Sequence, residues 1–154
     1  MDNPYYEKLM NAALRFVSFR PRSEKELTDF LSKNLTKWKV SGSGLLKKVI
    51  ERMRELGYVD DRKFADWWIT QRNSFRPKGK RAILFELKKR GVEVEEEFQF
   101  DEVASAQKAI SKKFVLWSRL PIIEQKKKTY TFLAQRGFSF QTITHIIDGP
   151  GKKD

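Results

Sequence analysis

One amphipathic phrase recurs along the chain, and this repetition restricts the possible folds more than any other feature. Its copies occupy residues 23–31, 78–87 and 126–133. Each copy ends in a leucine, and Leu27, Ile83 and Thr129 stand four residues earlier, one turn back on the same face of a helix. A helical phrase that recurs in this way indicates a modular helical protein and not a single globular enzyme domain.

The pattern predicts an all-α protein made of tandem modules. Apolar residues recur at intervals of three and four, with helix caps between them. We expect three tandem three-helix modules, similar to helix-turn-helix repeats, in an elongated, curved array. The predicted divisions are residues 1–59 for the first module with a loop insertion at 34–44, 60–100 for the second, 101–148 for the third, and 149–154 for a flexible tail.

Local signals predict several helix starts and the residues that face the core. Ser23 and Glu26 have the spacing of a capping box, in which each side chain accepts a hydrogen bond from the other residue's amide. Asp60 and Asp61 can cap free amides where the second module begins. The apolar periodicity also predicts a short third helix in the second module carrying Val94 and Phe98. Among the side chains that it predicts to face inward are Tyr5, Leu56, Phe75, Phe114, Ile122 and Tyr130.

Composition narrows the class of protein. The chain has 154 residues, of which 40% are hydrophobic, so a core can form and disorder is not expected. The absence of cysteine excludes disulfides and thiolate metal sites. No apolar run approaches the ~20 residues that span a bilayer, and the first residues do not have the pattern of a signal peptide. We therefore expect a cytoplasmic protein that does not act at a membrane.

The charge is strongly positive and unevenly distributed. The net charge is +12, and the positive charge is concentrated in the second and third modules, around one acidic island. The island contains Glu93, Glu95, Glu96, Glu97, Asp101 and Glu102. A basic field of this kind attracts polyanions, although a solvated basic surface without a ligand also explains it. We hypothesise that the island pairs with Lys88, Lys89 or Arg90 and limits nonspecific DNA binding; its alternative role is to stabilise the dipole of the following helix.

Several sequence phrases resemble the RecX family of regulatory proteins. They are residues 13–27, beginning Ala-Leu-Arg-Phe-Val, residues 56–65, Leu-Gly-Tyr-Val-Asp-Asp-Arg-Lys-Phe-Ala, the Lys-Gly-Lys-Arg of residues 78–81, and residues 86–92. Beyond Gly91 the resemblance depends on the helical pattern and on the turn at Arg136 and Gly137. The loop before Gly44 and the helix start at Pro121, which lacks a Lys-Gly phrase, depart from the family pattern.

The resemblance implies a regulator of homologous recombination. RecX proteins bind filaments of the RecA recombinase and restrain ATP hydrolysis, strand exchange and filament growth, and several also bind DNA. The expected protein is thus a monomeric, non-enzymatic regulator in DNA repair and recombination, with RecA filaments and single- or double-stranded DNA as partners.

Cations near the start and end of the repeated helices are the candidate contacts with these partners. Arginine suits bidentate capture of a carboxylate or phosphate, while lysine acts as a mobile point charge. The candidates are Arg20, Arg22, Arg72, Arg76, Lys78, Lys80, Arg81, Lys88, Lys89 and Arg90. For each of these cations, the alternative is that it lies on a solvated helix surface and contacts no partner.

A general nucleic-acid-binding module is the second hypothesis, because short helices joined by tight turns resemble helix-turn-helix units. Lys80 and Arg81 are followed by apolar residues, which favours phosphate binding over base reading. Among the tryptophans, Trp67 and Trp68 have core spacing, whereas Trp38 lies between two lysines and is the better candidate for stacking on bases.

An enzyme is the third and weakest hypothesis. Asp60 and Asp61 lack the further carboxylates of a nuclease metal site, and helix capping explains both. The one histidine, His145, has no cysteine or suitable carboxylate pattern near it. The sequence contains neither a phosphate-binding glycine loop nor a dinucleotide-binding phrase. We expect no catalytic residue, no metal and no cofactor.

Overall fold

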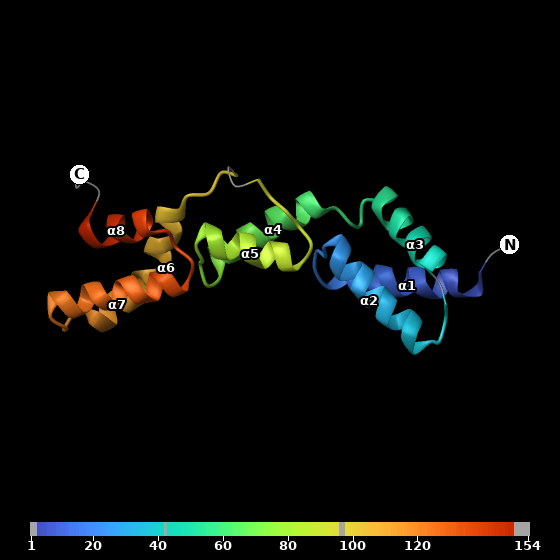
Figure 1. Ribbon diagram of the computed structural model, residues 1–154, viewed down its shortest axis with the longest axis horizontal. Coiled ribbons are helices and arrows are strands. Elements are labelled where there is room, and N and C mark those ends of the chain that lie inside the picture. The colour runs from blue at the N-terminus through green and yellow to red at the C-terminus, as the bar shows by residue number, and fades with distance from the viewer. Residues whose placement is uncertain (1–2, 42, 96–97, 150–154) are drawn as a thin grey trace. The chain divides into compact units, whose positions relative to one another are not determined.

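The described part of the protein is entirely helical. A computed structural model describes residues 3–41, 43–95 and 98–149, and within them it contains eight helices and no strand (Figure 1). The helices are α1 (Pro4–Phe19), α2 (Glu24–Lys37), α3 (Ser43–Glu55), α4 (Asp61–Ser74), α5 (Lys80–Lys89), α6 (Glu102–Trp117), α7 (Ile122–Gln135) and α8 (Phe140–Asp148). The predicted all-α class is confirmed. Over the described ranges, no helix combines the length and the hydropathy needed to cross a bilayer.

The chain divides into two compact units. Unit 1 consists of Met1–Trp67 with Leu87–Glu93, and unit 2 consists of Trp68–Glu86 with Val94–Asp154. Helices α4 and α5 each contribute residues to both units, so the division passes through the second predicted module.

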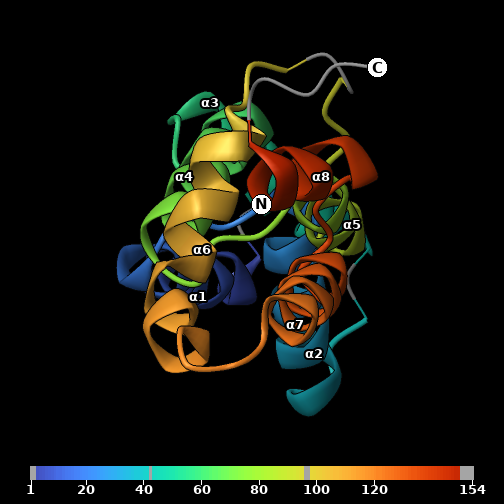
Figure 2. The ribbon, with the colours of Figure 1, turned by 90° about the vertical axis from the view of Figure 1, so that its left-hand side faces the viewer.

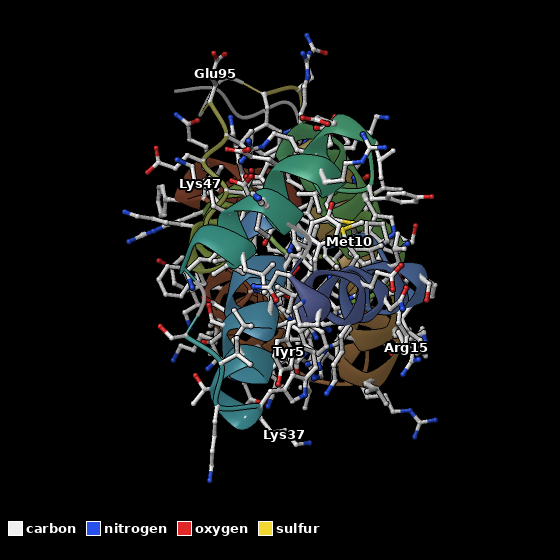
Figure 3. All side chains as sticks on the ribbon, turned by 90° about the vertical axis from the view of Figure 1, so that its right-hand side faces the viewer. Tyr5, Met10, Arg15, Lys37, Lys47 and Glu95 are labelled. Carbon is white, nitrogen blue, oxygen red and sulfur yellow. The ribbon has the colours of Figure 1, made fainter. Side chains whose placement is uncertain are left out.

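Helices α1, α2 and α3 form the core of unit 1. On α2 the side chains of Leu27, Leu31 and Leu35 recur at every fourth position and are all buried, which gives the helix one apolar stripe. The core cluster is completed by Leu9, Ala13, Leu45, Val49, Ile50, Met53 and Val59. Charged side chains point to solvent, including Lys37 at the end of α2 and Lys47 on α3 (Figure 3).

Helices α6, α7 and α8 group together in unit 2 (Figure 2). Their buried residues are Ala106 and Ile110 on α6, Leu133 on α7, Phe138 in the following turn and Ile143 on α8. Leu31, Leu87 and Leu133, the leucines that end the repeated phrase, are each 0% exposed. The repetition in the sequence therefore reflects a repeated buried position.

Short-range capping explains where several helices begin. The predicted capping box at the start of α2 is present, with hydrogen bonds in both directions between Ser23 and Glu26. Asp60 accepts hydrogen bonds from the first amides of α4, at distances of 3.0 and 3.2 Å to the nitrogens of Arg62 and Lys63. Asp101 and Ser139 cap α6 and α8 in the same way. Each cap satisfies an amide that has no partner within its helix.

The segment predicted as a loop insertion is partly helical. Helix α2 continues to Lys37 and α3 begins at Ser43, so residues 34–37 of the predicted loop belong to α2. The extension follows from Leu35, which is only 5% exposed and prolongs the apolar stripe by one turn. Gly42 lies outside the described residues.

Six residues that we predicted to face the core are exposed instead. The exposed fractions are 37% for Tyr5, 44% for Leu56, 67% for Phe75, 48% for Phe114, 65% for Ile122 and 45% for Tyr130. Phe114 and Ile122 lie in the last and first turns of α6 and α7, and Phe75 follows the end of α4, where fewer neighbouring side chains can cover them. Periodicity indicates a face of a helix but does not show how far along it a partner extends.

The short third helix predicted for the second module is also absent from the described residues between α5 and α6. Residues 92–95 and 98–101, which include Val94 and Phe98, are not helical. Val92 is 4% exposed and Val94 is half-buried, whereas Glu93 and Glu95 are exposed, so burial alternates along residues 92–95 as in an extended segment. The helix before them ends at Gly91, whose φ of 77° is strained for any residue with a side chain.

Candidate partner-binding surface

Three of the candidate cations in unit 1 lie next to the N-terminus of α2. Arg20 binds both carboxylate oxygens of Glu26, with nitrogen–oxygen distances of 2.6 and 3.3 Å. Arg90 lies 3.9 Å from the same carboxylate. Arg22 donates from Nε to the carbonyl oxygen of Phe16 at 3.1 Å, and its guanidinium lies 3.9 Å from the centre of that residue's ring. These contacts hold α2 against the end of α1.

A second cluster in unit 2 has a similar plan. Glu86 on α5 binds Arg72 from α4 through two hydrogen bonds, of 2.9 and 2.8 Å. Lys78, in the turn before α5, donates to the same carboxylate at 3.0 Å, and the Trp68 indole nitrogen lies 3.3 Å from it. The Arg72 guanidinium also lies 4.9 Å from the centre of the Trp68 ring. Arg72 and Lys78 are therefore held within the fold and are not extended toward solvent.

The electrostatics of both carboxylates confirm that these cations are engaged. Burial alone would raise the pKa of Glu86, but the hydrogen bonds from Arg72 and Lys78 outweigh it, so the pKa lies below its ordinary value. The pKa of Glu26 is lowered for the same reason, against the opposing effect of burial, by Arg20 and by the Ser23 amide. Removing a partner from such a half-buried pair leaves an uncompensated charge, which is costly.

Four of the predicted cations are exposed. They are Arg76, between α4 and α5, Arg81 in the first turn of α5, and Lys88 and Lys89 in its last turn. Arg76 has a φ of 51°, a left-handed conformation that is uncommon for a residue with a side chain. Lys80 is half-buried, with its ammonium 4.8 Å from the centre of the Phe98 ring. Exposure thus separates these four residues from Arg20, Arg22, Arg72 and Lys78, which are half-buried and contact other residues of their unit.

Another basic residue, which the sequence did not single out, is built into the turn after α7. Arg136 donates from its guanidinium to the carbonyl of Pro77 at 3.4 Å, and its guanidinium lies 4.7 Å from the centre of the Phe132 ring. Burial, with a smaller contribution from nearby Arg76, lowers the pKa of Arg136 below its ordinary value. The only sequence signal for this position is the Arg-Gly pair that it shares with Arg90 and Gly91.

The repeated sequence produces a repeated junction between helices. In unit 1 the hydroxyl of Ser23, just before α2, donates to the carbonyl of Arg90 at 2.7 Å. In unit 2 the amide of Gly79, just before α5, donates to the carbonyl of Arg136 at 2.8 Å. In both places, the start of one repeated helix meets the Arg-Gly turn that ends the next one.

An acidic side chain completes each junction. Asp61, the first residue of α4, accepts from the amide of Glu24 at 2.8 Å. Glu102, the first residue of α6, accepts from the amide of Lys80 at 2.8 Å. Both carboxylates therefore cap a helix other than their own. The sequence predicted capping by Asp61 but not by Glu102, and it did not indicate that Asp61 would cap a helix other than its own.

Trp38 does not have the exposure that we predicted for a stacking residue. Its ring lies 6.5 Å from the ring of Tyr5 and 4.2 Å from the ammonium of Lys8, and it packs against the core of unit 1. Trp68 is 8% exposed, as its core spacing predicted.

Two residues of the acidic island, Glu96 and Glu97, lie outside the described residues. The pairing of the island with the basic end of α5 therefore stays a prediction.

Comparison with known proteins assigns this architecture to a family. Residues 60–96 match a family model described as the second three-helix domain of RecX, and residues 101–147 match the model of its third three-helix domain. These two matches cover more than half of the chain. A solved structure of RecX from Lactobacillus salivarius superimposes with a TM-score of 0.75 and covers 93% of this chain and 94% of its own, at 22% identity.

Curated relatives extend the match to the N-terminal part. The regulatory protein RecX of Chlorobium phaeobacteroides is 29% identical over 151 residues, covering 92% of this chain and 93% of the relative. The regulatory protein RecX of Pelodictyon phaeoclathratiforme is 32% identical over 142 residues, covering 90% of this chain and 86% of the relative. With the matched domains and the shared helical fold, these similarities show that the chain belongs to the RecX family of regulatory proteins.

Proposed function

We propose that the protein binds filaments of the RecA recombinase and inhibits their ATP hydrolysis, strand exchange and growth. Family membership supports a regulatory role without an enzymatic one, and the sequence resemblance implies RecA as the partner. The observation that carries the proposal is the set of exposed cations at residues 76, 81, 88 and 89, which lie at or between repeated helices. A nucleoprotein filament offers them phosphates and carboxylates.

Arg76 and Arg81 are better candidates for these contacts than Arg72 and Lys78. Binding through Arg72 or Lys78 would require that residue to leave Glu86, whose side chain is 15% exposed, and would remove part of the compensation of that half-buried charge. Arg76 and Arg81 carry no such cost because both are exposed. Contacts from several separated cations make binding multivalent, so the affinity of the whole protein exceeds that of each contact.

An ATPase assay tests the proposal. RecA is assembled on single-stranded DNA, and its ATP hydrolysis is measured as the full-length protein is added. We expect inhibition that saturates, and weaker inhibition by the double variant R76E/R81E. The variant K47E/K48E is the matched control, because it reverses two exposed cations on α3 and changes the net charge equally. Unchanged hydrolysis at saturating wild-type protein would refute the proposal.

Nonspecific DNA binding is the second candidate function, and the net charge of +12 favours it. Such binding depends on phosphate neutralisation, so its affinity should fall steeply with salt and vary little with sequence. Equal affinity for bare DNA and for the RecA filament, at moderate salt, would favour this function over recombinase regulation.

A further inference from the structure

An open groove lies in unit 2 beside α5, α7 and α8. Its volume is about 1220 Å³, and its lining comes from the start of α5, the second half of α7 and the start of α8. This exceeds the range of about 300–1,000 Å³ that is typical for small-molecule sites, so the groove can accommodate more than one nucleotide-sized group. It is distinct from the clusters around Glu26 and Glu86, neither of which lines it.

Three exposed aromatic rings line this groove, and apolar side chains gathered in one patch mark an interaction site more often than scattered ones do. Phe85 from α5 is 60% exposed, Tyr130 from α7 is 45% exposed, and Phe140 from α8 is 67% exposed. Tyr130 and Phe140 contact each other edge-to-face, with ring centres 6.5 Å apart. This contact positions the two rings while a large part of each remains open to solvent.

The cationic side chains in the described lining of the groove outnumber its one carboxylate. Lys80 and Arg81 lie in its lining, and Lys127, one turn before Tyr130 on the same face of α7, is also exposed. Glu102 is the acidic residue among the lining residues, but its oxygens accept from the amides of Lys80 and Ser139 and from the hydroxyl of Thr142, at 2.8, 3.0 and 2.6 Å. Because two helix N-termini and a hydroxyl already hold that carboxylate, it repels an anion less than an exposed one would.

We propose that this groove binds single-stranded nucleic acid by stacking bases on the exposed aromatic rings, with phosphates near Lys80, Arg81 and Lys127. Every base has a face that can stack, so aromatic rings beside cations recognise a single strand without reading its sequence. A duplex cannot use the same rings, because its bases are already stacked on each other. An apolar peptide would use the rings but would leave the cations without partners.

This inference rests on the second candidate function, nonspecific DNA binding, and does not depend on recombinase binding. The cations of the proposed function share only Arg81 with the lining of the groove, since Arg76, Lys88 and Lys89 do not line it. The test of the groove therefore changes its aromatic rings and none of these cations. If the groove does not bind single strands, the expected inhibition of RecA ATP hydrolysis is unchanged. The two proposals can therefore be tested separately.

The test is a comparison of two strands that differ only in their bases. Fluorescence anisotropy measures the affinity of the full-length protein for a labelled oligothymidylate and for an abasic strand of the same length and charge. We expect the abasic strand to bind at least ~10-fold more weakly, because stacking on aromatic side chains contributes about that factor or more per base. This comparison uses the unmodified protein, so it does not depend on the folding of any variant.

Variants then locate the stacking. Y130A and F140A should each weaken oligothymidylate binding by ~10-fold, while Y130F should retain the affinity because the ring remains. The matched control is F114A, which removes an exposed aromatic of the same unit outside the groove. Equal affinity for the thymidylate and abasic strands, or Y130A and F140A variants that bind like F114A, would overturn the proposal. Weaker binding to RecA filaments with unchanged affinity for the bare strand would assign the groove to a protein partner and would also overturn it.

Discussion

The carboxylate of Glu102 connects three segments of unit 2. It accepts from the amide of Lys80 at the start of α5, from the amide of Ser139 before α8, and from the hydroxyl of Thr142 within α8. Burial alone would raise its pKa, but these hydrogen bonds, of which that from Thr142 contributes most, lower the pKa below its ordinary value. A single side chain therefore stabilises the positions of two helix starts.

Replacing Glu102 with alanine should destabilise unit 2. The substitution E102A leaves two helix N-terminal amides without their partner, and we expect a loss of about 1–3 kcal/mol in the free energy of unfolding. Urea unfolding followed by circular dichroism measures the loss. The substitution E93A is the matched control, since Glu93 belongs to the same acidic island and is exposed. Equal stability of the two variants would contradict the capping role.

Acid should weaken the fold through three carboxylates. The pKa values of Glu26, Glu86 and Glu102 all lie below the ordinary value of 4.5. A group whose pKa is lowered by folding stabilises the folded state above its ordinary pKa, and this contribution is lost as the pH falls through the lowered value. The free energy of unfolding should therefore stay nearly constant from about pH 7 to about pH 5 and decline below that.

The same unfolding measurement, repeated across this range, checks the pH dependence. The E102A variant should show a smaller decline than the wild-type protein, because one of the three titrating groups has been removed. A decline of equal size in both would indicate that Glu102 does not contribute to it.

Whether the role of a single residue could be predicted depends on how far away in the sequence its partner lies. The capping box of Ser23 and Glu26 could be predicted because its hydrogen bonds span only three residues. The role of Asp61 as a cap for α2 could not, because its partner Glu24 lies 37 positions away. For the same reason, sequence alone did not separate Arg72, which binds Glu86, from Arg81, which is exposed.

The junction of α5 with the turn after α7 depends on a glycine. A Cβ atom at Gly79 would lie 2.1 Å from the carbonyl oxygen of Gly137 and 2.5 Å from the Cα of Phe138. Both are backbone atoms, which cannot move away without displacing the turn. The glycine of the Lys-Gly phrase is therefore needed for close approach between two segments.

Substituting Gly79 with alanine should open this junction. We expect G79A to lose about 1–3 kcal/mol in the free energy of unfolding, the usual cost of forcing extra atoms into a packed site. The control is G44A on α3, where an added Cβ meets nothing within 4 Å. That variant should gain up to about 1 kcal/mol, because alanine favours a helix over glycine. Similar thermal unfolding of both variants would contradict the close approach.

Whole helices could be predicted where an apolar stripe and a cap coincide. Helix α2 has both, and only its length was underestimated, because Leu35 was assigned to a loop. The segment around Val94 has neither a cap nor a continuous stripe, and its predicted helix is wrong in the described residues. Tyr130 was predicted to face the core but lies in the lining of an open groove, because an apolar stripe cannot distinguish a core from a groove.

The whole chain combines a repeated helical plan with two classes of cation. Arg20, Arg72 and Lys78 are bound to carboxylates within the units, whereas Arg76 and Arg81 are exposed. The module divisions at residues 59–60 and 100–101 stay predictions, as does the assignment of individual cations to a partner. Membership of the RecX family is established by domains, relatives and fold together.

Co-sedimentation with RecA filaments tests the central claim most directly. Filaments assembled on single-stranded DNA are pelleted with the wild-type protein, with R76E/R81E and with K47E/K48E, and the bare strand serves as the comparison. We predict that the wild-type protein and K47E/K48E pellet with the filament more than with the bare strand at moderate salt, and that R76E/R81E stays largely in solution. Equal partition of the wild-type protein between filament and bare strand, or full retention of R76E/R81E, would contradict the account.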